Sequence, residues 1–191
     1  MKASDFSEVF LFFDYDCHQQ DKAGLLALDE LNQQMESMFG FFSDETENGK
    51  LYVNYPMVES IRYTKELPDA DYYKYEIQLQ NVRDFKRLAA DFSFYKNLDD
   101  ICFRVNKNNK LKELSSEQLE KVRRNWKFLV EQNVVKANLV CQGKKAWPKN
   151  KADVGQEKLL KGECDGFVNS QGTVSVLNSF PLFLYDYFLR L

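Results

Sequence analysis

Two carboxylates, one residue apart, end the most apolar stretch near the start of the sequence. Five apolar residues, Val9 to Phe13, run directly into Asp14 and Asp16, with one tyrosine between the two acids. In a β-strand, residues i and i+2 point to the same side, so these two carboxylates would converge. Converging carboxylates repel each other unless a cation lies between them, and a hard divalent ion prefers oxygen ligands. The spacing therefore predicts part of a Mg²⁺ site, for which Mn²⁺ is a substitute.

Two further side chains are candidates for the same site. Glu59 follows a second short apolar segment, Leu51 to Asn54, and lies in the first turn of the helix expected after it. If the two strands are parallel neighbours, Glu59 reaches the edge where the Asp pair ends; the alternative is a carboxylate that only caps its helix. His18, the single histidine, follows Asp16 by two residues. It is a candidate ligand or proton shuttle, with an ordinary loop histidine as the alternative.

A basic loop carries the candidate nucleic-acid contacts. Lys144, Lys145 and Lys149 surround Trp147 within a few residues. Lysines can contact a phosphate backbone while an exposed aromatic ring stacks on a base, so DNA or RNA is the predicted partner of this loop. The alternative is solvated loop charge, because a net charge of −3 gives the chain no overall attraction to nucleic acid.

The elements that must position the acids alternate in type over the first 65 residues or so. The short apolar run 9–13 predicts a strand buried on both faces, and the spacing of Leu and Met over 23–42 predicts an amphipathic helix. A turn at 43–49 leads to a strand at 51–54, and Pro56 favours a helix over 57–63. This alternation is typical of an α/β fold with a small, mainly parallel sheet and flanking helices.

The rest of the sequence predicts a helix-rich middle and a returning strand and helix. Ser115 to Glu117 is a plausible N-cap for a long helix, and the apolar residues over 173–177 indicate a strand. Pro181 opens a final helix that runs to Leu189. We therefore expect one domain over 1–191, divided as the three segments 1–66, 67–170 and 171–191.

Composition limits the classes of protein. The chain is 44% hydrophobic and 15% aromatic, which is ample for a packed core and argues against disorder. Its four cysteines are far apart and form no Cys-x-x-Cys pair, so neither a zinc site nor a disulfide scaffold is expected. No signal peptide opens the sequence and its apolar runs are shorter than the ~20 residues that span a bilayer, so we expect a cytoplasmic protein without a membrane partner.

The motifs resemble part of a TOPRIM-type domain. The sequence FLFFDYD, followed after a helix and a strand by NYPMVES, is similar to the branch found in OLD-family nucleases and in related proteins of prokaryotic defence islands. The resemblance implies that Asp14, Asp16 and Glu59 hold Mg²⁺ for phosphodiester chemistry on nucleic acid, in a mobile-element or phage-defence setting. It covers residues 8–65, and more loosely 172–191.

The sequence departs from the family pattern at one catalytic position. TOPRIM domains carry a Glu on a strand well before the Asp-x-Asp, where it commonly acts as the general acid or base. Only thirteen residues precede Asp14, and the single Glu among them, Glu8, begins the same strand. The alternatives are a fragment, a split partner that works with an ATPase or another protein, and a degenerate relative.

Other classes share the Asp-x-Asp spacing. A non-catalytic protein-interaction module would keep the fold and use the acids only to end the strand. An Asp-x-Asp phosphatase would use Asp14 as a nucleophile. It would also need a late acidic pair at a strand end, and Asp99-Asp100 precedes an apolar run instead of following one. If the chain is an enzyme, a Mg²⁺-dependent nuclease-type phosphoryl transfer is the expected activity.

Overall fold

The computed structural model describes residues 7–15, 25–93 and 115–188. Its main sheet has three strands in the order β1-β3-β2, with β1 at Phe10–Asp14, β3 at Gly49–Asn54 and β2 at Ser43–Asp44. β1 and β3 run parallel, with Phe10 opposite Lys50 and Asp14 opposite Asn54. The two strands predicted from apolar runs are therefore parallel neighbours that end at the same edge, whereas the short β2 is antiparallel to β3.

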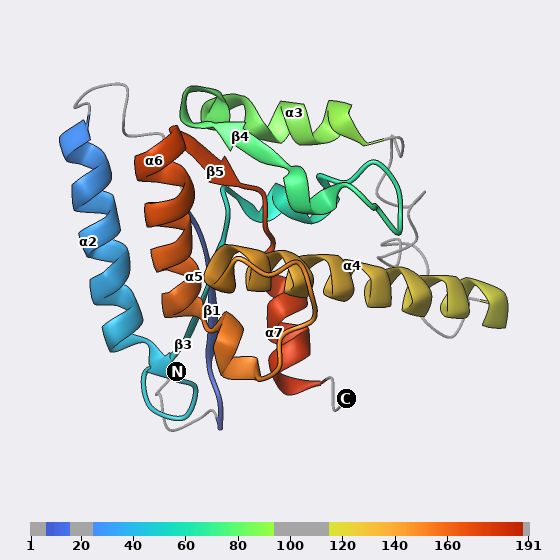
Figure 1. Cartoon of the computed structure of the whole chain (residues 1–191). Coiled ribbons are helices and arrows are strands. Elements are labelled where there is room, and N and C mark those ends of the chain that lie inside the picture. The colour runs from blue at the N-terminus through green and yellow to red at the C-terminus, as the bar shows by residue number, and fades with distance from the viewer. Residues whose placement is uncertain (1–6, 16–24, 94–114, 189–191) are drawn as a thin grey trace.

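The central strand β3 is covered on both faces, which is why its residues from Leu51 to Asn54 are all buried. Successive side chains alternate between faces. The Tyr52 ring meets that of Phe183 of α7, Ser179–Tyr187, edge-on, so this face of the sheet packs against α7. The opposite face packs against α2, Leu25–Phe41, and α5, Gln156–Glu163. Figure 1 shows α2 and α5 on one side of the two strands and α7 on the other.

A second, two-stranded sheet corrects the expectation of one mainly parallel sheet. β5, Thr173–Ser175, pairs antiparallel with β4, Glu76–Gln78, and joins the first sheet only through an antiparallel bridge between Tyr55 and Leu177. The α/β class is confirmed, but the described strands include one parallel pair and two antiparallel pairs. Apolar runs of three to five residues report that a strand is buried, and they carry no information about its partner or direction.

Helices make up most of the remaining described chain. The long helix predicted after Ser115 is α4, Ser116–Gln142, and the Ser115 side chain and Gln118 form a reciprocal capping box at its start. The helix expected after Pro56 is a 3₁₀ helix, Val58–Arg62. The other helical segments, in chain order, are the 3₁₀ helices Tyr72–Lys74 and Leu79–Asp84, α3 Phe85–Phe92, the 3₁₀ helix Lys151–Val154, the π-helix Cys164–Val168 and α6 Asn169–Gln171.

One buried cluster joins both ends of the described chain. It includes Val53 of β3, Tyr15 just after β1, Val134 of α4, Leu159 of α5 and Leu182 of α7. α4 crosses in front of the sheet and packs against α7 and α5, while its first half extends beyond the other elements (Figure 1). Within the described ranges, none of the helices combines the length and the apolar character that crossing a bilayer requires.

Candidate functional site at the ends of β1 and β3

Asp14 lies at the carboxyl end of β1, directly opposite Asn54 at the end of β3. Its Oδ1 atom accepts a hydrogen bond of 3.0 Å from Asn54 Nδ2. Asn54 itself is 2% exposed, because it lies between β1 and the start of α7. Functional groups of parallel α/β sheets gather at this edge, since the carboxyl ends of the strands and the starts of the following segments meet there.

The orientation of the Asn54 amide is set by α7. Both the backbone N–H and the hydroxyl of Ser179 donate to Asn54 Oδ1, at 3.0 and 2.8 Å. Since these donors require an oxygen acceptor, the NH₂ group of Asn54 faces Asp14. The amide therefore holds the Asp14 carboxylate in one place and links it to the first turn of α7.

The same turn of α7 also fixes the segment that carries Glu59. Asn178, the N-cap of α7, donates through Nδ2 to the carbonyl of Val58 at 3.0 Å and to Ser60 Oγ at 3.1 Å. These two residues flank Glu59 in the 3₁₀ helix that follows β3. The Glu59 side chain is 19% exposed, and its Oε1 lies 3.8 Å from Lys86 Nζ of α3. Glu59 is thus held next to the site's hydrogen-bond network, with a lysine as its charged neighbour.

The complete predicted metal site cannot be assembled from the described residues, because Asp16 and His18 lie outside them. Among the residues that are described, no group of three His, Cys, Asp or Glu side chains is placed to hold a metal ion. The donors that are placed fit a hard cation. The Asp14 carboxylate is oriented by a hydrogen bond from an amide. In metal sites, carboxylate ligands are commonly oriented in the same way, by residues that do not contact the metal themselves.

Three polar residues of this site were not predicted from the sequence. Asn54, Asn178 and Ser179 form the hydrogen bonds that connect β1, β3, the 3₁₀ helix and α7. A local signal was present for two of them, since Asn178 and Ser179 precede Pro181 at the start of a helix, where Asn and Ser are preferred caps. Asn54 ends an otherwise apolar strand, which is the same position that drew attention to Asp14.

The predicted nucleic-acid loop lies between α4 and the 3₁₀ helix Lys151–Val154. Asn138 of α4 fixes the loop by donating to the carbonyls of Lys144 and Ala146, at 3.2 and 2.8 Å. Trp147 is 37% exposed, and its ring meets that of Tyr185 edge-on at 5.3 Å. Lys144 and Lys149 are exposed. The loop is thus an ordered, basic surface with one partly exposed tryptophan, and its binding of nucleic acid stays a prediction.

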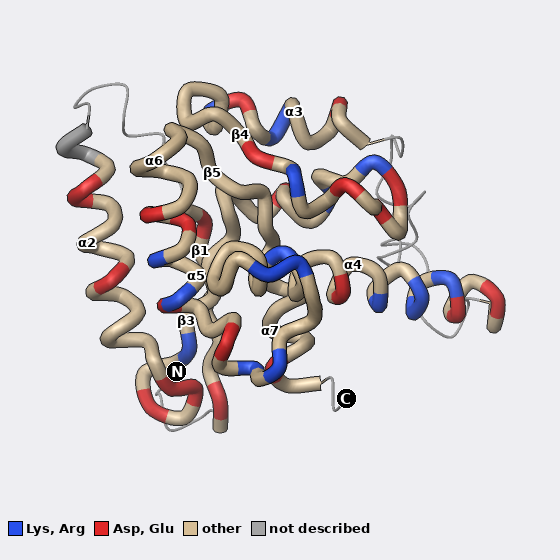
Figure 2. Tube along the Cα trace, in the orientation of Figure 1, with Lys and Arg blue, Asp and Glu red and all other residues tan. Residues whose placement is uncertain are grey.

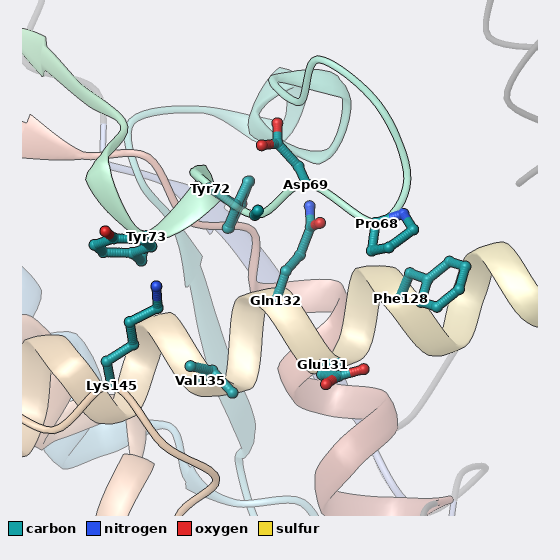
Figure 3. A pocket seen from close by; sticks show the side chains of 10 residues that line it. Pro68, Asp69, Tyr72, Tyr73, Phe128, Glu131, Gln132, Val135 and Lys145 are labelled. Atoms are coloured by element: carbon teal, nitrogen blue, oxygen red, sulfur yellow. The ribbon is translucent and has the colours of Figure 1, made fainter.

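Lys145 reaches from this loop into a groove of about 530 Å³ between α4 and the segment 68–73. Its Nζ lies 3.3 Å from the centre of the Tyr73 ring, and the side chain points to that ring in Figure 3. Phe128, Val135 and Pro68 supply apolar wall to the same groove. The Lys145 charge is therefore already engaged by an aromatic face of the protein itself.

A buried pair of titratable groups lies away from the strand ends. Glu163 of α5 is 0% exposed and Lys136 of α4 is 1% exposed. Burial raises the pKa of Glu163 to about 8 and lowers that of Lys136 to about 7, while each partner's charge opposes the shift of the other. The Lys136 ammonium donates to the carbonyls of Tyr72 and Tyr75, and the Ser175 N–H donates to Glu163 Oε2 at 3.0 Å. Shifted pKa values often mark catalytic groups. Here both groups are buried in the core: Lys136 ties α4 to the segment 72–75, and Glu163 ties α5 to β5.

Comparisons of the chain with models of protein families, with curated proteins and with solved structures find no match. The TOPRIM-type resemblance therefore rests on the sequence motifs alone.

Proposed function

We propose that the carboxyl ends of β1 and β3 form a divalent-cation site for phosphodiester chemistry on nucleic acid, in the manner of a TOPRIM-like module. The observation that supports the proposal is the parallel pairing that brings Asp14 opposite Asn54, with Asn54 oriented by Ser179. A carboxylate fixed in this way at a strand end is ready to hold a cation without reorganisation.

Each residue has a role in this proposal. Asp14, Asp16 and Glu59 hold the cation through oxygen atoms, Asn54 positions Asp14, and His18 exchanges protons with water or the leaving group. A bound Mg²⁺ or Mn²⁺ would supply charge neutralisation at the phosphate and a water of lowered pKa. Lys86, 3.8 Å from Glu59, compensates the negative charge of that carboxylate at the edge of the site.

Metal binding is the first test. Millimolar Mg²⁺ or Mn²⁺ is expected to raise the melting temperature of the wild-type chain, because a ligand that binds only the folded state stabilises it. Asp14→Asn should abolish this rise. Asp165→Asn, which changes an exposed carboxylate that pairs with Lys161, is the matched control and should keep the rise. A wild-type chain whose melting temperature does not respond to either metal would exclude the cation site.

A non-catalytic interaction module is the second candidate. Both described acids already have partners in the protein, Asn54 for Asp14 and Lys86 for Glu59, as expected of acids with a purely structural role. In that case Asp14→Asn would change the melting temperature by the same amount with and without metal. The metal titration therefore separates the two candidates.

A further inference from the structure

A groove of about 470 Å³ runs between the first half of α4 and the end of α7. Its floor is apolar, with Val122, Trp126 and Val130 from α4, Leu184 from α7 and Phe188 just after the end of α7. Phe188 is 68% exposed, so its ring presents most of its surface to solvent. A large exposed ring at a groove usually marks a contact surface, because apolar area in water is unfavourable unless a partner covers it.

The aromatic surface continues from this groove to β1. The ring of Trp126 lies 5.6 Å from that of Phe180, and Phe180 lies 5.8 Å from Phe12 of β1. Phe12 is 40% and Phe180 36% exposed. We call the four residues Phe12, Phe180, Trp126 and Phe188 the aromatic strip.

The strip ends at the candidate cation site. Phe12 and Asp14 are two residues apart on β1, so their side chains lie on the same face of the sheet. Phe180 follows Ser179, whose N–H and hydroxyl orient the Asn54 amide that holds Asp14. Because the ring of Phe180 also contacts that of Phe12, both rings lie on the same side of the sheet as Asp14.

The other end of the strip is basic. Arg123 and Lys127 line the rim of the α4–α7 groove together with one acid, Glu120, whose carboxylate is 4.0 Å from Arg123. The first half of α4, residues 116–128, carries two acidic side chains near its start and four basic ones after them, along the extended part of the helix in Figure 2. The rim therefore favours an anionic ligand over an uncharged apolar one.

We propose that the aromatic strip and the basic rim bind single-stranded nucleic acid and lead it to Asp14. Bases would stack on the four rings of the aromatic strip, Phe188 included, while phosphates meet Arg123 and Lys127, which is how sequence-tolerant single-strand sites are built. A duplex keeps its bases inside the stack, so it cannot use the rings. The direction toward Asp14 rests on the proposed function, whereas the binding surface itself stands on the strip and its rim.

Binding is tested on the full chain by fluorescence anisotropy with a labelled oligothymidine, in EDTA so that no cation takes part. Phe188→Ala should weaken binding about tenfold, the loss expected for one stacked base. Phe41→Ala removes a ring of similar exposure, 59%, that contacts Phe42 away from the strip and should bind as wild type.

Arg123→Gln with Lys127→Gln should reduce the slope of log Kd against log salt by about 1.4, for two lost phosphate contacts. Arg87→Gln, an exposed arginine of α3, is its control.

Tryptophan fluorescence locates the binding site within the chain. The sequence holds two tryptophans, so Trp147→Phe leaves Trp126 as the reporter and Trp126→Phe leaves Trp147. Quenching by oligothymidine is expected in the variant that keeps Trp126. Quenching only in the variant that keeps Trp147 would move the site to the basic loop and overturn the proposal. So would equal affinity for a duplex, or a Phe188→Ala variant that binds as wild type or changes only the oligomeric mass of the protein.

The result is independent of the metal titration. Oligothymidine binding by the strip without a metal-dependent melting temperature would keep this inference and remove the cation site. A metal-dependent melting temperature without oligothymidine binding would do the reverse.

Discussion

Glu163 shows what a single buried carboxyl group does to the stability of this chain. It accepts a backbone hydrogen bond from Ser175 through Oε2, whereas Oε1 has no hydrogen-bond partner in the described part of the chain. An ionised carboxylate with an unsatisfied oxygen in the core is unfavourable, so the folded protein holds the proton of Glu163 to a higher pH than the unfolded chain does.

The sign of the pH dependence follows from this shift. Because the folded pKa is raised from 4.5 to about 8, the contribution of Glu163 to stability is fully present below pH 4.5 and is lost as the pH rises through 8. This loss approaches about 1.4 kcal/mol per pH unit between the two values. In Glu163→Gln the loss should disappear. Urea unfolding at a series of pH values measures it.

Lys136 provides an internal check on the same experiment. Its folded pKa is lowered to about 7, so its contribution is present above pH 10.5 and is lost as the pH falls through 7. In Glu163→Gln, where only Lys136 remains of the pair, stability should therefore rise with pH above 7. Glu157→Gln, at an exposed position of α5, should keep the wild-type pH profile. An unchanged profile in Glu163→Gln would show that Glu163 is ionised in the folded protein.

At the scale of elements, the crossing of α4 and α5 depends on one glycine. A Cβ atom at Gly162 would lie 2.6 Å from the carbonyl oxygen of Val140, far inside a normal contact. Gly162→Ala should therefore force the two helices apart and lower the free energy of unfolding by about 1–3 kcal/mol. Gly166→Ala adds a methyl group where no atom lies within 4 Å, so it should be close to neutral. If both variants unfold at the same urea concentration, α4 and α5 do not approach each other closely at Gly162.

The elements differ in how well the sequence predicts them, and the reason is the range of the interactions involved. The N-cap predicted over Ser115 to Glu117 and the amphipathic helix predicted over 23–42 are local patterns, and the structure has an N-cap at Ser115 and α2 at Leu25–Phe41. β4 was not predicted, because three residues with one buried side chain, Ile77, form a strand only through pairing with β5. Asp14 was predicted as a strand-end acid, but its link through Asn54 to Ser179 joins residues 125 positions apart and has no periodic signal.

At the scale of the whole molecule, the proposed chemistry predicts slow turnover. No residue of this sequence matches the upstream Glu of the TOPRIM pattern, and a positioned acid or base is typically worth about 10²–10⁴ in rate. With Mn²⁺ and supercoiled plasmid, the chain alone should nick DNA slowly, and Asp14→Asn should remove that activity. His18→Ala tests whether His18 handles the proton. Rapid nicking that His18→Ala abolishes would identify this residue as the acid–base group and contradict the expectation of slow turnover.

The network around Asn54 also determines when the site can form during synthesis. Asn54 leaves the ribosome 125 residues before Ser179, which orients its amide, and Asn178 is separated from Val58 by 120 residues. At about 5–20 residues per second, the ends of β1 and β3 wait ~6–25 s for the turn that completes them. Contacts this far apart in sequence also form late in folding, because the chain must close a long loop before they stabilise it. A nascent chain stopped before residue 178 would therefore carry Asp14 without the turn of α7 that holds it in place, and could contain most of the helices while its acidic edge stays unformed.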